Sequence, residues 1–259
     1  MPRPIGSVSL FLFNACLAFS QPAAAPPAFE VASVKVNTAG INEGMGRGRE
    51  IVTPSPAGIS MINVRLKSVI QWAYHVQPVQ ISGPGWLDVD RYDIIAKAAG
   101  ATPEDQLRQM MQKLLADRFK LALHRESKEM LAYVITVAKS GLKIKIKEST
   151  SEGDMSIQPS GEAAATIERA TVSRLAEMLS EPLQSPVIDE TGLTGRYDFK
   201  IDLTSFMANL DHDHPMGIND AISLIIQAAQ QQLGIKIDQK KMPVEMLMVD
   251  HAEKLPVEN

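Results

Sequence analysis

The tetrapeptide Arg-Tyr-Asp-Ile at residues 91–94 has a near copy, Arg-Tyr-Asp-Phe, at residues 196–199. Each copy follows a turn that contains glycine, Gly-Pro-Gly-Trp-Leu at residues 83–87 and Thr-Gly-Leu-Thr-Gly at residues 191–195. Each copy also opens a run with the pattern of a strand, and stretches with helical spacing lie before and after it. The repeated phrase therefore predicts a fold built from two copies of one unit.

The pattern around each copy is strand, helix, strand, strand, helix, strand, strand. Apolar residues recur at helical spacing in four stretches, which predict helices over residues 66–74, 103–116, 172–179 and 218–233. The second of these has a clear start signal, because Thr102 can cap a helix and Pro103 suits its first turn. We therefore expect an α+β fold of two similar halves, each with two helices packed on a small, mostly antiparallel sheet.

Each half is expected to end in a β-hairpin. The first half has strand-like runs on both sides of a turn at residues 127–129, and the second half has them on both sides of a turn at residues 240–243. The last strands of the two halves then correspond, with residues 130–137 matching residues 242–249.

These patterns divide the chain into five parts. The parts are a signal peptide (1–20), an Ala- and Pro-rich leader (21–28), a first α+β half (29–147), a linker (148–162) and a second α+β half (163–254). The region of residues 140–161 has an alternative interpretation, because its polar pattern also fits an edge strand that continues the sheet.

The N-terminus has the features of a secretory signal peptide. Arg3 supplies a positive charge, residues 7–19 are mostly apolar, and small residues suit cleavage after Ser20. Cys16 is the only cysteine and would leave with this peptide. Lipid attachment at Cys16 is the alternative, but Phe-Asn-Ala at residues 13–15 suits it poorly. We therefore expect an exported protein, periplasmic or extracellular, with no transmembrane segment in the mature chain.

Composition excludes one class of partner. The 259 residues carry a net charge of -4, with 45% hydrophobic and 22% charged residues, which is ordinary for a globular protein. A nucleic-acid-binding protein needs a basic surface to neutralise phosphates, and no stretch of this sequence interleaves Lys and Arg with aromatic residues. We therefore expect no nucleic-acid partner.

The most metal-like stretch is Asp-His-Asp-His at residues 211–214, because imidazole and carboxylate groups bind zinc and other divalent ions. Side chains this close in sequence rarely all reach one ion, so His212 and His214 fit a polar loop better. His124 and His251 each lie beside an acidic residue and could serve as general bases, but no nucleophile motif accompanies them. The sequence therefore assigns no catalytic, cofactor-binding or metal-binding residue.

The charged residues of the repeated phrase are Arg91 with Asp93 and Arg196 with Asp198. Each pair lies on one face of its strand, because alternate residues of a strand share a face. The two charges of each pair could bond to each other or cap the neighbouring helix and turn, or they could face a ligand between the halves, and the structural role fits better. The tyrosine inside each pair would then face the core.

Several stretches resemble a known family. The most specific are Ile-Ser-Gly-Pro-Gly-Trp-Leu-Asp-Val-Asp-Arg-Tyr-Asp at residues 81–93, Leu-Leu-Ala-Asp-Arg-Phe-Lys-Leu-Ala-Leu-His-Arg-Glu at residues 114–126 and Thr-Gly-Leu-Thr-Gly-Arg-Tyr-Asp-Phe at residues 191–199. With residues 29–34 and 249–254 they resemble the soil-associated family of exported bacterial proteins, which has no assigned activity. The domain of that family also occurs attached to membrane metallopeptidases similar to β-lactam sensors, which implies sensing or binding.

A fainter resemblance is to the short N-terminal domain of secretins and TonB-dependent receptors, which is a small protein-interaction module. Residues 63–95 and 171–199 have its order of elements. Both resemblances imply a non-enzymatic binding or interaction protein of the cell envelope, with an envelope protein as its partner. The alternative is a hydrolase, possibly metal-dependent, with a site between the halves that uses His124, His251 or the His212 loop.

Overall fold

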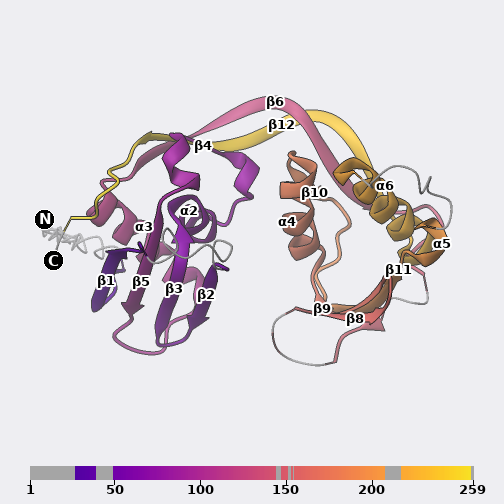
Figure 1. Ribbon diagram of the computed structural model, residues 1–259, viewed down its shortest axis with the longest axis horizontal. Coiled ribbons are helices and arrows are strands. Elements are labelled where there is room, and N and C mark those ends of the chain that lie inside the picture. The colour runs from indigo at the N-terminus through magenta and orange to yellow at the C-terminus, as the bar shows by residue number, and fades with distance from the viewer. Residues whose placement is uncertain are drawn as a thin grey trace, which may run out of the picture.

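The computed structural model describes residues 27–38, 49–143, 147–150, 153, 155–207 and 217–257. It confirms the predicted α+β class, because helices pack against three mostly antiparallel sheets. Figure 1 shows these elements in two lobes that are joined by a long two-stranded ribbon. Within the described ranges, every helix is too short or too polar to span a bilayer.

The first lobe is built on a sheet with the strand order β1-β5-β3-β2. Its strands are β1 (Val31–Val36), β2 (Ile51–Ser55), β3 (Gly58–Arg65) and β5 (Arg91–Lys97), and its helices are α2 (Leu66–Tyr74) and α3 (Glu104–Phe119). Alternate side chains of β5, namely Tyr92, Ile94 and Ala96, share one buried core with residues of both helices. Both helices therefore cover the same face of this sheet.

The helices of this lobe form close to where the sequence predicts them. α2 buries the residues that have helical spacing, which are Leu66, Val69, Ile70 and Ala73. α3 begins at Glu104, one residue later than predicted, because Pro103 keeps an extended backbone as the cap residue. α3 also continues to Phe119, which is fully buried in the core.

The second lobe is built on a sheet with the strand order β7-β11-β9-β8. Its strands are β7 (Lys147–Glu148), β8 (Ser156–Gly161), β9 (Ala164–Ala170) and β11 (Tyr197–Asp202). Its helices are α4 (Val172–Leu183), α5 (Thr204–Met207) and α6 (Ile218–Ala228), and α6 continues as the π-helical turn η3 (Ala229–Leu233). The region expected as a linker thus contributes β8, an edge strand of this sheet.

The third sheet joins the lobes, with the strand order β10-β6-β12-β4. Its strands are β4 (Ile81–Ser82), β6 (Ala122–Val137), β10 (Val187–Asp189) and β12 (Ile235–His251). The two predicted hairpins are wrong, since β6 and β12 are each one continuous strand and pair antiparallel with each other along their length. Neither expected turn contains the glycine or asparagine that tight hairpins favour, so neither strand folds back on itself.

Each long strand therefore contributes to both lobes (Figure 1). Leu247 of β12 lies in the core of the first lobe. Ile135 of β6 lies in the core of the second lobe, together with Ile235 and Ile237 from the start of β12. Between the lobes the ribbon carries a small third cluster, formed by Ala132, Val244 and Met246 with the partly buried Met130, Ile188, Met242 and Met248.

Candidate functional site

The strand β3 has an irregularity shortly before α2 begins. Its register with β5 shifts between Met61 and Val64, and Asn63 has a left-handed backbone with a φ of 56°. A bulge of this kind takes backbone groups out of the ladder. The carboxylate of Asp93 accepts a hydrogen bond from the backbone N–H of Asn63 at 2.8 Å and another from the side-chain amide of Asn37 at 2.8 Å.

The same arrangement recurs in front of α4. Arg169 also has a left-handed backbone with a φ of 56°, and the Asp198 carboxylate accepts a hydrogen bond from its N–H at 2.7 Å. The aspartates of the repeated phrase thus hold the strand-to-helix turns before α2 and α4. This geometry agrees with the structural role that the sequence favours for Asp93 and Asp198.

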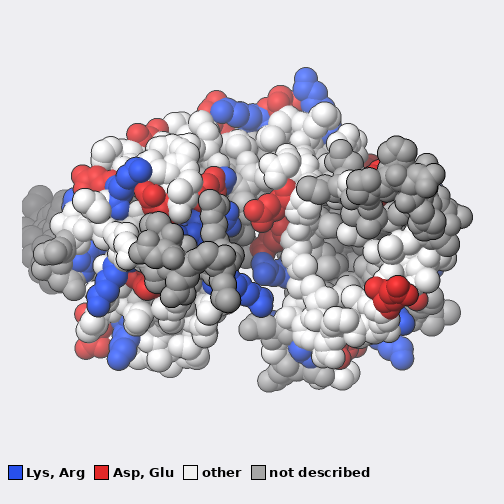
Figure 2. All heavy atoms as spheres, in the orientation of Figure 1, with Lys and Arg blue, Asp and Glu red and all other residues white. Residues whose placement is uncertain are grey.

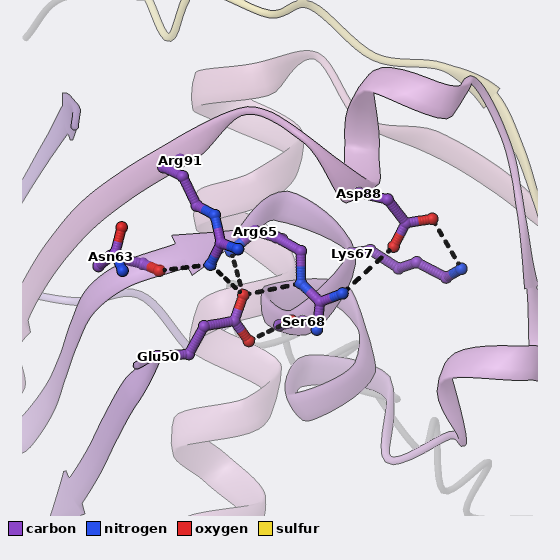
Figure 3. Close-up of polar contacts among 7 residues, drawn as sticks. All are labelled: Glu50, Asn63, Arg65, Lys67, Ser68, Asp88 and Arg91. Carbon is purple, nitrogen blue, oxygen red and sulfur yellow. Dashed lines mark hydrogen bonds and ion pairs between the residues drawn. The ribbon is translucent and has the colours of Figure 1, made fainter. Parts of the chain in front are cut away.

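A polar cluster lies beside the first of these turns (Figure 3). Oε1 of Glu50 accepts hydrogen bonds from the backbone N–H and the Nε of Arg65, at 2.9 and 2.8 Å, and from Nη1 of Arg91 at 2.8 Å. Oε2 of Glu50 accepts a hydrogen bond from the hydroxyl of Ser68 at 2.7 Å. Nη1 of Arg91 also donates to the carbonyl of Asn63 at 2.9 Å. Glu50 therefore ties together the end of β3, the start of β5 and the first turn of α2.

The two central groups of this cluster stay charged. Burial favours the neutral form of Glu50, but hydrogen bonds from Arg65 and Ser68 outweigh burial and lower the pKa of the Glu50 carboxyl group. Burial also acts against the charge of Arg65, but the bond to Glu50 outweighs it and raises the pKa of the guanidinium. A carboxylate that keeps its charge and has both oxygens bonded is a poor general base.

The cluster reaches toward the second lobe. Asp88, in the 3-10 turn η2 (Gly85–Asp88), accepts from Nζ of Lys67 at 3.0 Å and lies 3.8 Å from Nη1 of Arg65. Glu181 of α4 also favours the charged form of Arg65, although it belongs to the other lobe. Figure 2 shows acidic and basic side chains close together where the two lobes meet.

The arginines and tyrosines of the repeated phrase differ between its copies. Arg196 donates to the carbonyl of Gly153, whereas Arg91 bonds to Glu50. Tyr92 is fully buried, as predicted, and its hydroxyl donates to the carbonyl of Lys254 at 2.8 Å. Burial, with a smaller effect of Asp90, raises the pKa of Tyr92 to about 12. The equivalent Tyr197 is only partly buried against the second core.

The two described candidate histidines, His124 and His251, make their contacts outside this cluster. Nδ1 of His124 is 2.8 Å from the Asp250 carboxylate, with the two side chains 56% and 49% exposed. Nε2 of His251 lies 3.9 Å from the carboxylate of Glu253. His212 and His214 fall outside the described residues. Across the part of the chain that the structure describes, no three His, Cys, Asp or Glu side chains gather closely enough to hold a metal ion.

A pocket of about 300 Å³ lies between the start of β1 and α3. Phe29 and Val31 line it on the strand side, and Met110, Lys113 and Leu114 line it on the helix side. β1 is the outermost described strand of its sheet at this side, so the pocket adjoins a sheet edge. This surface combines apolar side chains with the charged side chains of Glu30, Asp117 and Arg118.

Sequence reasoning missed the partnership of Glu50 with Arg65 and Arg91. Glu50 lies 15 residues from Arg65 and 41 from Arg91, so both contacts depend on how β2, β3 and β5 pair. The one available signal was the repeated phrase itself, which marks Arg91 but not its partner.

Comparison with known proteins adds the family. The family model described as "Protein of unknown function (DUF3738)" matches residues 67–252, which is more than half of the chain. No curated protein and no solved structure is significantly similar to the chain. The chain therefore belongs to the DUF3738 family of proteins of unknown function.

Proposed function

We propose that the chain is an exported protein of the cell envelope, periplasmic or extracellular, that binds a protein partner and has no catalytic activity of its own. The signal-peptide features of residues 1–20 support export. The predicted likeness to soil-associated exported proteins and to secretin-type interaction domains supports binding in the envelope.

The polar groups support a binding role over catalysis. Glu50 has both oxygens bonded inside the fold, and the bonds that lower the pKa of its carboxyl group make it a weaker base. His124 and Asp250 contact each other where both side chains are about half exposed to solvent. An enzyme needs such groups to converge with a nucleophile or a metal.

The observation that carries the proposal is a difference among edge strands. Edge strands invite pairing with another chain, and proteins protect them with proline or keep them short. β2 contains Pro54, β8 contains Pro159, and β7 is two residues long. β1 is six residues long without proline, and its Val31 and Val36 are 59% and 45% exposed.

The backbone of β1 suits the addition of a strand. The N–H of Asn37 donates to the carbonyl of Arg91, so the alternation of an antiparallel ladder turns the backbone groups of Lys35 toward β5. Val34 and Val36 then direct their N–H and C=O groups to the outer edge. An extended segment beside Val34 and Val36 could form main-chain hydrogen bonds at this end of the edge. The proposed partner is therefore an extended segment of another envelope protein.

The experiment is a capture from an envelope extract of the native host. The bait is the chain without residues 1–20, tagged at the C-terminus, in three forms: unchanged, Val36→Pro and Val36→Ala. Both variants lose the valine side chain, but only proline removes the outward N–H. A stoichiometric partner that binds the unchanged and alanine forms and not the proline form supports the proposal. Equal capture by all three forms contradicts docking at this edge.

The second candidate function is a hydrolase, which the 2.8 Å contact between His124 and Asp250 favours. A His held by a carboxylate is the arrangement of many general bases. The metal content of the same purified bait tests the metal-dependent form. Tightly bound zinc that is lost on His212→Ala and His214→Ala would favour the hydrolase over the binding protein.

We also propose that the two lobes derive from one duplicated unit, each with helices on a small antiparallel sheet. The strand orders β1-β5-β3-β2 and β7-β11-β9-β8 support this, since matching strands occupy matching places. Left-handed residues support it as well. They pair as Asn63 with Arg169 before α2 and α4, His75 with Gln184 after the same helices, and Lys120 with Gly234 after α3 and η3.

A further inference from the structure

The segment after α2 carries a side chain to the other lobe. α2 ends at Tyr74 and is followed by the cap residue His75, whose left-handed backbone has a φ of 51°, and the chain continues into the 3-10 turn η1 (Pro78–Gln80). The backbone N–H of Gln77 donates to Oε1 of Gln80 at 2.9 Å. This bond fixes the position from which the side chain of Gln77 projects.

β10, whose Val187 lies in the core of the second lobe, presents backbone groups to that side chain. β6 forms backbone hydrogen bonds with Pro186 and with Glu190, on either side of β10. In a parallel pair this pattern turns the backbone groups of Ile188 toward β6. Val187, the neighbour of Ile188, therefore directs its N–H and C=O to the opposite, outer edge of the sheet.

The Gln77 amide bonds to both of these groups. Its Oε1 accepts from the N–H of Val187 at 2.8 Å, and its Nε2 donates to the carbonyl of Val187. A neighbouring strand would offer the same acceptor and donor, so the amide takes the place of a strand at this edge. Val187 is only 1% exposed, so the contact leaves this part of the edge covered.

The ribbon that joins the lobes allows movement. The chain crosses between the lobes in β6 and returns in β12, so the crossing is a two-stranded ribbon. Nε2 of Gln80 donates to the Glu245 carbonyl of β12 at 2.8 Å, which anchors η1 to the ribbon. The cluster under the ribbon includes Met130, Met242 and Met246. Methionine is unbranched and repacks easily, so this cluster can follow a bend.

We propose that Gln77 is a latch that sets how the two lobes stand relative to each other. With the latch closed, as in this structure, the outer edge of β10 is covered. With the latch open, the lobes pivot on the β6–β12 ribbon and the edge of β10 becomes available to an extended chain. The latch uses no residue of the β1 edge, so the test of the latch and the test of docking at β1 have independent outcomes.

The test measures the distance between the lobes. Spin labels are placed on the exposed positions Gln109 of α3 and Ser173 of α4, as Gln109→Cys and Ser173→Cys, in the chain with Cys16→Ser. Pulsed electron paramagnetic resonance then measures the distance between the two labels in the protein with Gln77 unchanged and in the Gln77→Ala and Gln77→Glu variants. We expect alanine to broaden or shift the distance distribution, and glutamate to do so less, because it keeps an acceptor for the N–H of Val187.

Gln112 provides the matched control, because its side-chain amide donates to the carbonyl of Ala73 at 2.8 Å inside the first lobe. Gln112→Ala should leave the distance distribution unchanged. Hydrogen exchange gives a second readout: the Val187 amide should exchange roughly threefold to tenfold faster in Gln77→Ala. The latch is overturned if Gln77→Ala and Gln77→Glu both leave the distance distribution and the exchange rate of the Val187 amide unchanged.

Discussion

Met130 of β6 and Met242 of β12 lie directly opposite each other near the middle of the ribbon that joins the two lobes. Each lies at or beside a point where the sequence predicts a turn. Both strands instead continue without a turn, so the end of β12 packs in the first lobe and the end of β6 packs in the second. The first core accordingly contains Leu247, and the second contains Ile135.

The aspartates of the repeated phrase should stabilise the fold through the turns before α2 and α4. Asp93→Ala leaves the N–H of Asn63 without its carboxylate acceptor, so we expect a loss of about 2 kcal/mol in the free energy of unfolding, measured with urea. Asp93→Asn keeps an acceptor oxygen and should lose less. The pair Asp198→Ala and Asp198→Asn should show the same order, because Arg169 donates to Asp198 in the same way. Equal losses for Ala and Asn would show that the hydrogen bond is not the cause.

Glu50 should make stability depend on acidity. Its pKa is lower in the folded chain than in the unfolded chain, so its contribution is fully present above the ordinary pKa of a glutamate. That contribution is lost as the pH falls through the lowered folded pKa. Glu50→Gln removes the titrating group, so its unfolding free energy should fall less steeply on the acid side than that of the unchanged chain.

Urea unfolding at a series of acidic pH values gives this measurement. Glu104→Gln is the control, because Glu104 pairs with Arg108 at an exposed position on α3. If Glu50→Gln and Glu104→Gln have the same acid-side slope as the unchanged chain, the Glu50 cluster does not contribute in the way its contacts indicate.

Tyr92 should anchor the C-terminal segment to the first core. Its hydroxyl donates to the carbonyl of Lys254, and its ring packs edge-on against Phe119 with centroids 5.1 Å apart. Tyr92→Phe keeps the ring and removes the hydrogen bond, so we expect a loss of roughly 1 kcal/mol. Hydrogen exchange should rise most in residues 252–257. A uniform rise along the whole chain would instead indicate a general loss of packing.

The exposed His124–Asp250 pair should contribute little to stability. Both side chains are about half exposed, and surface ion pairs typically contribute less than about 1 kcal/mol. His124→Ala should therefore leave the unfolding free energy within about 0.5 kcal/mol of the unchanged value. A larger loss, measured by urea unfolding, would show that this pair has a role that its exposure conceals.

Local patterns predicted the helices well, because their spacing and start signals are contained in short stretches. The apolar positions of α2 are all buried, and α3 begins within one residue of its expected start. The repeated phrase also marked the two aspartates that hold the strand-to-helix turns. These features depend on residues close together in the sequence, or on alternation within a single strand.

The passage of β6 and β12 from one lobe to the other could not be predicted in the same way. A strand that continues and a strand that turns have the same alternating pattern on either side of the turn, so residues 127–129 and 240–243 fit both. Whether such a strand turns or continues is decided by its pairing with strands that are far away in the sequence. The contact of Gln77 with Val187 depends on how the lobes come together, and that of Glu50 with Arg91 depends on how β2, β3 and β5 pair, which is why the sequence did not reveal them.

The proposed function is tested most directly by the affinity of the captured envelope partner for purified protein altered at β1. We predict that Val36→Ala binds within about threefold of the unchanged protein, and that Val36→Pro binds about tenfold or more weakly, because proline removes one outward N–H from the edge. Circular dichroism and urea unfolding must show both variants folded. Equal affinity of the folded Val36→Pro and Val36→Ala variants would contradict binding by strand addition at β1.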